Sequence, residues 1–521
     1  MTNFDLSLHL FSFLKQAGVD TLVICAGARN APLVLALQNE NFKIYSYFEE
    51  RSASFFALGL IKSIKKPVAV ITTSGTAAAE LLAATIESYY QGLPLILITA
   101  DRPKSYRGTG SPQTIEQVGL FSNYVESVYD LDVFTQNFSF RWSLKKPLHL
   151  NVAYDEPLMD LQSTALIKTS LEIPESSISE NIKFSIKGLI SPLIILGEIP
   201  QQYNNLVVDF ILKIKAPVYA ETLSQLKHVS EIKNYILESS ESLIKQIIKL
   251  KLCDSVIRIG GVPTLRFWRD LEYEFKNIPV TNYSDLPFSG LSRESVLIGI
   301  DKLEAKFEFS TDKLQKIKES DYKLQMAKES LLIKYPMSEQ SLTKQLSEVV
   351  TTNAVYLGNS LPIRNWDHFA NAQSKNVSAN RGANGIDGQV SSYLGWSENL
   401  KKSFCYVGDL TAMYDLAALG LKSQLNQNQR HIVVLNNFGG QIFRRVFNKK
   451  SDKNDNFINA HTTKFYHWAQ MWEWNYLQVS DVTDLKKLAA LNTPFNIVEV
   501  LPEAEQTQLF WDEWEKLCQT L

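Results

Sequence analysis

The sequence predicts an α/β protein of three domains, each built on a parallel sheet flanked by helices. Short, continuously apolar segments alternate with longer segments of helical period along nearly the whole chain of 521 residues. Continuous apolarity is typical of strands that are covered on both faces, as in parallel sheets. The chain is also too long for one hydrophobic core, so two to four domains are expected.

The expected strands fall into three groups that follow one another along the chain. They lie within residues 21–27, 43–48, 67–74, 94–100 and 147–153, then 192–198, 255–261 and 296–300, and finally 354–360, 404–409, 431–437 and 495–501. The connections are long enough for right-handed βαβ crossovers. The grouping predicts domains over residues 1–175, 185–305 and 336–521, with a charged linker helix over 306–335.

Composition and charge exclude several classes of protein. The formal net charge is −2 and the basic residues are not concentrated in one block, which argues against a nucleic-acid groove or a membrane surface. Cysteines 25, 253, 405 and 518 are scattered without a CxxC pair, so reduced thiols are expected rather than disulfides or zinc ligands. The N-terminal segment contains Asp5 and no cleavage site, and no apolar run reaches membrane-spanning length. We therefore expect a soluble, cytoplasmic protein.

Polar residues gather where several expected strands end. They occupy residues 25–32, 72–80, 99–105, 357–364, 408–415 and 435–440. In open parallel sheets, ligands bind beyond the carboxyl ends of the strands. The clustering therefore predicts binding sites in the first and third domains.

One pair of strand ends has the residues of a metal site. Asp409 ends one strand and Asn437 ends the next, with 25 residues between Leu410 and Asn436 that read as a helix. Adjacent parallel strands would place Asp409 beside Asn437, and a carboxylate with an amide oxygen suits Mg²⁺. Gly439 and the helix start after Asp409 would let backbone N–H groups approach an anion. The alternative is that these residues only form a turn and a helix cap.

This spacing resembles the thiamine diphosphate signature of a superfamily of decarboxylases and carboligases. The resemblance implies a pyrimidine-binding N-terminal domain and a C-terminal domain that binds diphosphate and metal. It implies that Asp409, Asn437 and the carbonyl of Gly439 bind Mg²⁺ (or Mn²⁺). The implied cofactor contacts are Glu50, Thr73, Ser74, Gly75, Ile386, Gly408, Asp409, Leu410, Thr411, Asn437, Gly439, Gln441 and Ile442.

The resemblance also implies an activating glutamate at a strand end of the first domain. The segment 43–60 fits, because a strand is followed by Glu49, Glu50 and Arg51 and then by a helix rich in small residues. Glu50 is then the catalytic carboxylate that hydrogen-bonds the cofactor's aminopyrimidine, and Ile386 the apolar wedge that keeps the cofactor bent. The alternative is that both carboxylates only favour a helix N-terminus. A cofactor that spans two domains suggests a dimer in which Glu50 faces the diphosphate site of the other chain.

Four arginines lie in loops beside these motifs: Arg29, Arg102, Arg364 and Arg381. Arginine binds carboxylates through two parallel hydrogen bonds and stays charged when buried. Although a single loop arginine is usually a surface residue or a structural ion pair, four beside one cofactor site predict a pocket for substrates with several carboxylates.

Within the superfamily, the motifs resemble the 2-succinyl-5-enolpyruvyl-6-hydroxy-3-cyclohexene-1-carboxylate synthases of menaquinone (vitamin K2) biosynthesis. The motifs are "GARNAPLVLAL", "TADRP", "GNSLPIR", "NRGANGIDG" and "NNFGGQIF". The implied substrate-binding residues are Arg29, Arg102, Gln113, Arg266, Ser360, Arg364, Arg381 and Phe443, with Ile442 and Val446 beside Phe443 in an apolar wall. Ala28, Asn30, Pro112 and Arg266 depart from the family's usual residues, which leaves individual substrate contacts open.

The resemblance implies a transferase. It would decarboxylate 2-oxoglutarate and add the succinyl carbanion equivalent to isochorismate in a 1,4-addition, giving CO₂ and the product named above. Gln113, water or the cofactor's own amine could transfer protons. The rivals are another thiamine diphosphate enzyme, such as acetolactate synthase or a 2-oxoacid decarboxylase, and an inactive cofactor-binding scaffold. A nicotinamide dehydrogenase is disfavoured because no GxGxxG follows a first strand. A homodimer or a dimer of dimers is expected.

Overall fold

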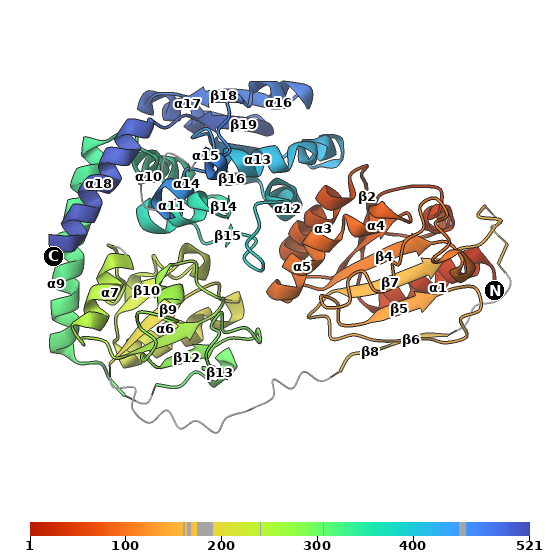
Figure 1. Cartoon of the computed structure of the whole chain (residues 1–521), viewed down its shortest axis with the longest axis horizontal. Helices are drawn as coiled ribbons and strands as arrows, with labels where there is room; N and C mark the ends of the chain where they lie inside the picture. The colour runs from red at the N-terminus through yellow and green to blue at the C-terminus, as the bar shows by residue number, and fades with distance from the viewer. Residues whose placement is uncertain are drawn as a thin grey trace.

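Three large parallel sheets, each flanked by helices, make up the computed structural model (Figure 1), so the predicted α/β class is confirmed. The structure describes residues 1–159, 162–163, 168–174, 191–239, 241–305, 307–446 and 455–520. The predicted domain boundaries at residues 175, 185 and 306 lie outside these ranges. None of the described helices combines the length and the apolarity needed to cross a bilayer.

The N-terminal sheet has the strand order β2-β1-β3-β4-β7-β5. Its strands are β1 Thr21–Ile24, β2 Lys43–Ser46, β3 Val68–Thr72, β4 Leu95–Asp101, β5 Val128–Leu131 and β7 Leu148–Ala153, and a small separate sheet pairs β6 Phe138–Arg141 with β8 Thr169–Glu172. Alternate residues of β3 enter opposite cores, Val68 and Val70 on one face and Ala69 and Ile71 on the other. This double burial explains why the strand sequence is continuously apolar. The helices are α1 Asn3–Gln16, α2 Ala31–Ala36, α3 Glu50–Ile64, α4 Thr76–Ala79 and α5 Leu82–Gln91.

The central sheet has the order β10-β9-β11-β12-β13. Its strands are β9 Pro192–Leu196, β10 Val218–Ala220, β11 Ser255–Ile259, β12 Val280–Tyr283 and β13 Val296–Ile298, with helices α6 Asn204–Ile214, α7 Glu241–Lys249 and α8 Phe267–Asp270. The charged stretch that follows forms α9, Thr311–Lys334. One side of α9 is buried, including Ile317, Leu324 and Leu331, because the helix packs on the central core.

The C-terminal sheet has the order β15-β14-β16-β17-β19-β18. Its strands are β14 Ala354–Leu357, β15 Val377–Ser378, β16 Lys402–Gly408, β17 Gln429–Leu435, β18 Asn475–Val479 and β19 Phe495–Val500. Its helices are α10 Glu339–Val350, α11 Leu361–Phe369, α12 Gln389–Trp396, α13 Asp409–Tyr414, α14 Ile442–Val446, α15 Asp455–Ile458, α16 Tyr466–Met471, α17 Leu485–Ala489 and α18 Ala504–Thr520. In Figure 1, α18 returns along α9, at the end of the molecule opposite the N-terminus.

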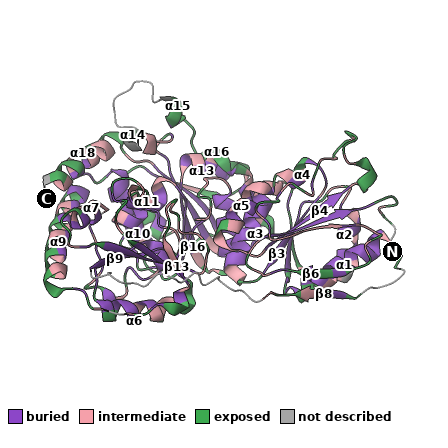
Figure 2. Cartoon of the chain, turned by 60° about the horizontal axis from the view of Figure 1, so that its bottom comes forward, coloured by how far each residue is buried: buried purple, intermediate pink, exposed green. Residues whose placement is uncertain are grey.

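The two outer sheets trace the same path. If the strands of each large sheet are numbered along the chain, both sheets have the order 2-1-3-4-6-5. In each sheet the second strand leads to a helix, α3 or α12, and these two helices pack together through glycines. A Cβ on Gly59 of α3 would lie 1.9 Å from the Ser392 carbonyl oxygen, and one on Gly395 of α12 would lie 2.1 Å from the Phe56 carbonyl oxygen. Every residue of α12 is buried, and Figure 2 shows this junction as predominantly buried.

All twelve expected strand segments contain strands, whereas other strands were missed for identifiable reasons. β5, β10, β15 and β18 lie at sheet edges or are very short, and β12 contains Asn282. The side-chain Nδ2 of Asn282 donates to the Val296 carbonyl and to the Ser295 hydroxyl, both at 3.0 Å, so its amide nitrogen is satisfied inside the sheet. The prediction of one continuous helix after Asp409 is also wrong. It breaks at Asp415, whose buried carboxylate accepts hydrogen bonds from Ser52 and Ser391.

Candidate active site

The predicted site residues lie beyond the carboxyl ends of strands in the two outer sheets. In the N-terminal sheet, Arg29 follows β1, Glu50 follows β2, Thr73 follows β3 and Arg102 follows β4. In the C-terminal sheet, Ser360 follows β14, Arg381 follows β15, Asp409 follows β16 and Asn437 follows β17. Because the strands of each sheet are parallel, each set shares one edge, and the chain carries two half-sites.

Asp409 and the 437–439 turn meet in the C-terminal half-site. Asp409 is buried, and its Oδ2 accepts a hydrogen bond of 2.8 Å from the Gly439 N–H. Gly439 has φ +133°, and a Cβ there would lie 2.5 Å from the Ile458 carbonyl oxygen, so the turn admits only glycine. Burial raises the pKa of Asp409 above its usual value, which marks a carboxylate that would gain from a bound cation.

The two adjacent asparagines have different tasks. Asn436 is fully buried, and its Nδ2 donates to Glu499 and to the Thr463 carbonyl, so it holds the structure of the turn. Asn437 is only partly buried, and its Nδ2 donates to Glu339 Oε1 at 2.7 Å. Because Glu339 takes the amide nitrogen, the amide oxygen of Asn437 is left as the group for a metal.

These donors fit a Mg²⁺ ion with a diphosphate. One buried carboxylate, one oriented amide oxygen and a turn that excludes a Cβ supply hard oxygen ligands and room for further oxygens. Among the described residues, no group of three or more His, Cys, Asp and Glu side chains is placed to hold a metal ion. His461 Nε2 lies 3.2 Å from Asp409 Oδ2 and belongs to the same half-site.

Further predicted cofactor contacts surround this turn. Leu410 N–H donates to Asp409 Oδ1 at 2.6 Å, and Thr411 is buried one residue further into α13. Gln441 Nε2 donates to the Asn437 carbonyl at 3.1 Å. Ile442 and Phe443 are partly buried at the start of α14, and the side chain of Val446 lies outside the described part of the chain.

Glu49 and Glu50 are separated by function at the start of α3. Glu49 is the N-cap, and its carboxylate accepts hydrogen bonds from the N–H groups of Arg51 and Ser52 at 3.2 and 2.9 Å. The carboxylate of Glu50 is partly buried and makes no hydrogen bond to another described residue; it bonds only to the backbone of Glu50 itself. Burial, with smaller contributions from Glu49 and Glu80, raises its pKa. A half-buried carboxyl group with a raised pKa suits proton exchange with a ligand nitrogen.

Glu50 does not reach the metal half-site of its own chain in the described structure. It lines a shallow pocket with Glu80, Tyr414 and Leu416, and none of Asp409, Asn437 and Gly439 lines that pocket. The helix start is fixed there because Arg51 Nη2 donates to the Tyr414 carbonyl at 2.9 Å. Glu50 therefore lies near the far end of α13, the helix that begins at Asp409.

The loop after β3 is held by a residue that the sequence did not single out. Gly75 has φ +83°, and its N–H donates to Gln117 Oε1 at 2.9 Å. Gln117 is fully buried and also bonds the Ala100 carbonyl, so it connects the ends of β3 and β4. Thr73 and Ser74 lie in this loop. Gln113 packs against Gly75, is itself exposed and has φ +55°, a strained conformation of the kind found at functional sites.

Two arginines of the N-terminal half-site keep donor groups available. Arg29 Nη1 donates to the Tyr154 carbonyl at 3.1 Å, and Arg102 Nε donates to the Pro112 carbonyl at 3.1 Å. By contrast, Arg107 makes two hydrogen bonds of 2.8 Å to Asp130 and an ion pair with Asp101, so its role is structural.

The departure at Asn30 has a structural explanation. Its Oδ1 accepts from the Gly27 N–H and its Nδ2 donates to the Cys25 carbonyl, both at 2.9 Å, so this side chain closes its own loop.

Arg364 and Arg381 belong to the C-terminal half-site. Arg364 Nη1 donates to the carbonyl of Ser360, which has φ +71°, and Arg381 Nη1 donates to Asn359 Oδ1 at 2.8 Å. Burial lowers the pKa of both guanidinium groups. Two buried acids that the sequence did not indicate, Glu221 and Asp367, partly offset this effect. Burial next to Asp367 raises the pKa of Glu221 to about 8.

The loop that carries Ile386 is fixed to the N-terminal domain. Glu87 of α5 accepts hydrogen bonds of 2.7 Å from the N–H groups of both Gly382 and Ala383. A Cβ on Gly388 would lie 2.0 Å from the Phe55 ring of α3, so the loop lies directly on that helix. Ile386 is partly buried in this loop. Arg266, in contrast, has a side chain that is 68% exposed, and its Nε lies 3.9 Å from an Asp270 carboxylate oxygen.

Glu339, Glu87, Gln117 and His461 are the neighbours of the site that the sequence reasoning missed. Each acts on another site residue through contacts that form only in the folded chain. Only Gln117, four positions after Gln113 and close to the quoted motifs, offered a signal in the sequence.

Comparisons with known proteins show which proteins this chain resembles. The family model described as "Thiamine pyrophosphate enzyme, N-terminal TPP binding domain" matches residues 4–120. A protein of Bdellovibrio bacteriovorus named "2-succinyl-5-enolpyruvyl-6-hydroxy-3-cyclohexene-1-carboxylate synthase" is 44% identical, and the match covers 99% of each chain. Proteins with the same name from Akkermansia muciniphila and Staphylococcus aureus are 36% and 31% identical, covering 94% and 96% of this chain and 95% of each relative.

Proposed function

The chain belongs to the family of 2-succinyl-5-enolpyruvyl-6-hydroxy-3-cyclohexene-1-carboxylate synthases, and we propose that it catalyses the reaction for which its relatives are named. It is a thiamine diphosphate-dependent enzyme of menaquinone biosynthesis that transfers a succinyl group. The donor is 2-oxoglutarate, which loses CO₂, and the acceptor is isochorismate. The observation that carries this proposal is the full-length similarity together with the meeting of Asp409, Asn437 and Gly439 at one strand edge.

The C-terminal half-site would hold the diphosphate through a divalent cation, Mg²⁺ or Mn²⁺. Its ligands are the carboxylate of Asp409, the amide oxygen of Asn437 and the carbonyl of Gly439. Glu339 supports the assignment of Asn437, because its hydrogen bond of 2.7 Å to the amide nitrogen orients the amide oxygen. The apolar side chain of Ile386 and the loop from Thr73 to Gly75 would contact the organic part of the cofactor. When bound, thiamine diphosphate supplies the carbanion nucleophile and the electron sink for decarboxylation.

Glu50 is the residue that exchanges a proton with the cofactor's aminopyrimidine. Its partial burial and raised pKa favour a carboxyl group that shares a proton with a ring nitrogen. Glu49 already provides the helix cap, so the carboxylate of Glu50 is available to a ligand. The assignment also explains why an ionisable residue stands at this position with no protein partner among the described residues.

The active form is a homodimer or a dimer of dimers. Support comes from the two half-sites, since Glu50 and the metal ligands of one chain open at different places. A second copy would bring its Glu50 opposite Asp409 of the first, and each active site would then contain residues from both chains.

The arginines orient the two carboxylate-rich substrates. Arg29 and Arg102 would act from one half-site and Arg364 and Arg381 from the other. Each of them uses one guanidinium nitrogen in these hydrogen bonds within the protein and has further N–H groups for a substrate. Fixing both reactants by several carboxylate contacts lowers the entropic cost of the addition. Gln113 and Ser360 flank these arginines, and the positive φ of each supports a role in contacting the substrate.

We also place the enzyme in the cytoplasm. None of the four cysteines is in a disulfide in the described structure and three of them are buried, which supports a reducing compartment.

A direct assay tests the proposed function. Purified protein is supplied with Mg²⁺, thiamine diphosphate, 2-oxoglutarate and isochorismate, and the loss of isochorismate absorbance is followed. Consumption that requires 2-oxoglutarate supports the proposal. Turnover of pyruvate without isochorismate would instead indicate a decarboxylase or an acetolactate synthase, and cofactor binding without any turnover would indicate a scaffold.

A further inference from the structure

His461 lies beside the proposed metal ligands, on the segment that connects α15 to α16. Its side chain is 10% exposed, and its Nε2 lies 3.2 Å from Oδ2 of Asp409. The ring also makes an edge contact with the ring of Phe438, which belongs to the same turn as Asn437 and Gly439, and the two ring centroids are 6.0 Å apart. A nine-tenths buried imidazole therefore borders the place where a metal-bound anion would lie.

Two hydrogen bonds fasten the segment that carries His461 to this turn. The Gly440 N–H donates to the Ile458 carbonyl, and Nδ2 of Asn436 donates to the Thr463 carbonyl at 3.0 Å. His461 lies between these two anchors along the chain. Its position beside the turn is therefore set by the fold and does not depend on a hydrogen bond of its Nε2.

A hydrogen bond to one ring nitrogen decides which nitrogen of His461 carries the hydrogen. The Thr463 N–H donates to Nδ1 at 3.1 Å, so Nδ1 is an acceptor. In a neutral imidazole the hydrogen then resides on Nε2. Nε2 is therefore a donor, and it has no lone pair to offer to a metal ion.

This donor has no acceptor within the described part of the chain. Nε2 makes no hydrogen bond to a described residue, although Oδ2 of Asp409 is 3.2 Å away, so the two groups are not aligned for one. The carboxylate of Asp409 already accepts the N–H groups of Leu410 and Gly439, at 2.6 and 2.8 Å. A buried N–H group without an acceptor is costly, which indicates that a ligand supplies one.

The geometry of metal coordination identifies the acceptor. Mg²⁺ binds its ligands octahedrally at about 2.0–2.1 Å, so neighbouring ligand atoms lie about 3 Å apart. A donor beside Asp409 therefore also lies beside the next oxygen of the coordination shell. In the proposed site, oxygens of the diphosphate occupy such positions, and phosphate oxygens are strong acceptors for N–H groups.

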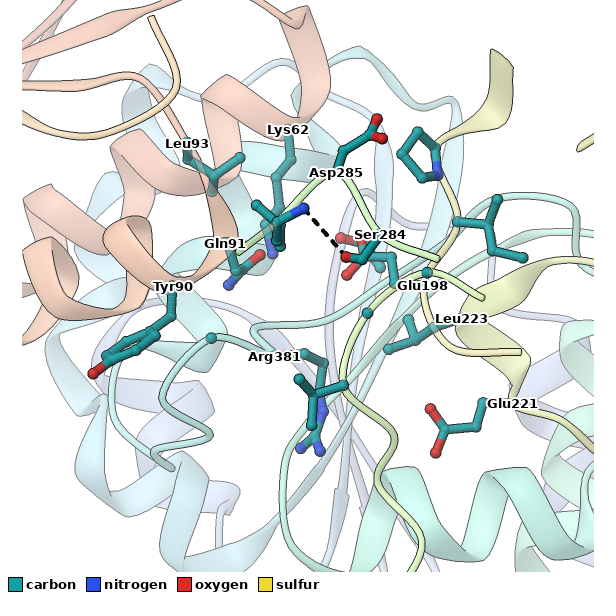
Figure 3. Close-up of a pocket in the computed structure, with 18 of the residues that line it drawn as sticks. Lys62, Tyr90, Gln91, Leu93, Glu198, Glu221, Leu223, Ser284, Asp285 and Arg381 are labelled. Carbon is teal, nitrogen blue, oxygen red and sulfur yellow. Dashed lines mark hydrogen bonds between the residues drawn. The ribbon is translucent and has the colours of Figure 1, made fainter. Parts of the chain in front are cut away.

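This half-site is distinct from the large cavity of about 1610 Å³ that residues of all three domains line (Figure 3). Asp409, Asn437 and His461 do not line that cavity, whereas the cationic side chains of Lys62 and Arg381 do. An anion held by those cations would not depend on His461. Replacement of His461 therefore distinguishes the two locations for a phosphate probe.

We propose that His461 is a further cofactor-binding residue, whose Nε2–H donates a hydrogen bond to an oxygen of the metal-bound diphosphate. The inference rests on the proposed function, because it requires a diphosphate at Asp409 and Asn437. The contact holds the diphosphate against Asp409 and leaves the reacting end of the cofactor to other residues. Loss of the contact should therefore lower the affinity for the cofactor and leave kcat at saturating cofactor nearly unchanged.

Calorimetric titration of the full-length protein in the presence of Mg²⁺ tests the contact. The probes are thiamine diphosphate and inorganic pyrophosphate, which has the phosphates without the organic part. His461→Phe should bind both about 10- to 100-fold more weakly, the effect of losing a hydrogen bond to a charged group. His461→Gln should lose much less affinity, because its amide nitrogen can still donate. Equal affinities of His461→Phe and the wild-type protein would refute the contact.

Two controls separate this role from a structural one. The melting temperature of unliganded His461→Phe should match that of the wild-type protein, because Nε2 has no hydrogen-bond partner among the described residues. His467→Phe makes the same substitution at an exposed histidine of α16 and should bind both probes normally. A loss of affinity in His467→Phe as large as that in His461→Phe would contradict the assignment.

A crystal structure of the complex with Mg²⁺ and thiamine diphosphate identifies the accepting atom. We expect Nε2 within about 3.2 Å of a phosphate oxygen. Nε2 bonded to Asp409 alone would overturn the diphosphate contact. A wild-type protein that binds neither probe would overturn the proposed function and this contact with it, whereas normal binding by both the wild-type protein and His461→Phe would overturn the contact alone.

Discussion

Glu49 caps the helix that Glu50 begins, and the two adjacent carboxylates therefore do different work. The cap consumes the carboxylate of Glu49 in hydrogen bonds to Arg51 and Ser52, whereas Glu50 remains without a partner among the described residues. The same division occurs at Asn436 and Asn437: the amide of Asn436 holds the turn, whereas Asn437 bonds to Glu339 through its nitrogen and supplies its oxygen to the proposed metal site. In both pairs, one residue builds the local structure that presents its neighbour.

Glu50→Gln should therefore reduce turnover by about 100-fold or more while leaving the melting temperature unchanged, because the helix cap is intact. Glu49→Ala should instead lower the stability of the protein by about 1 kcal/mol, because it removes the helix cap. Steady-state assays and thermal unfolding of both variants separate these effects. Near-normal turnover in Glu50→Gln would refute its assignment.

Asp409→Asn should weaken binding of Mg²⁺ and thiamine diphosphate by about 100-fold, since it removes the only carboxylate of the proposed ligand set. Calorimetry with both components measures this affinity. Asp481→Asn is the matched control, because Asp481 is an exposed acid of the same domain that caps a short helical turn. Equal affinities in the two variants would show that the metal binds elsewhere.

Arg102 and Arg107 provide a test within one loop. Arg102→Gln should raise the KM for a substrate about 10- to 100-fold, the effect of losing a charge-assisted hydrogen bond. Arg107→Gln should instead lower the melting temperature, because it removes the cation that forms an ion pair with the buried carboxylate of Asp101. The idea fails if Arg107→Gln changes KM as much as Arg102→Gln does.

Glu221 predicts a specific dependence of stability on pH. Its pKa of about 8 in the folded protein exceeds the ordinary glutamate value of 4.5, so between these pH values the unfolded chain has released a proton that the folded chain retains. The free energy of unfolding must then fall as pH rises through this window, by at most about 1.4 kcal/mol per pH unit. Urea unfolding at pH 6 and pH 8 should show a smaller loss in Glu221→Gln, which keeps an acceptor for Thr264. Identical losses in both proteins would contradict the prediction.

The glycine contact between α3 and α12 should be sensitive to a single methyl group. Gly59→Ala should destabilise the protein by about 1–3 kcal/mol, because its Cβ would meet the backbone of α12. Gly119→Ala has nothing within 4 Å of the added Cβ and should change the melting temperature little. Thermal unfolding compares the two, and equal stabilities would show that the helices separate readily.

The sequence predicted the parts of the fold and site that depend on local pattern. Continuous apolarity located the strands that are buried on both faces. The rule that ligands bind at strand ends, together with the resemblance to the thiamine diphosphate superfamily, singled out Glu50, Asp409 and Asn437 as site residues, which stay a prediction. The sequence did not locate β12, where the amide nitrogen of Asn282 bonds to the neighbouring strand β13, or the helix break at Asp415, which depends on Ser52 from far along the chain. Glu221 and Glu339 were missed for the same reason, since their roles come from tertiary contacts that no spacing encodes.

The matching strand order of the outer sheets has an evolutionary consequence. A chain whose halves repeat one topology and meet through like helices is the expected product of gene duplication and fusion in an ancestor that paired with itself. Gly59 and Gly395 would then derive from the same glycine of the ancestor, which packed against its own copy in the paired chain. Specialisation could assign proton exchange to one copy and metal binding to the other, while the joint between them stayed too tight for either to gain a side chain.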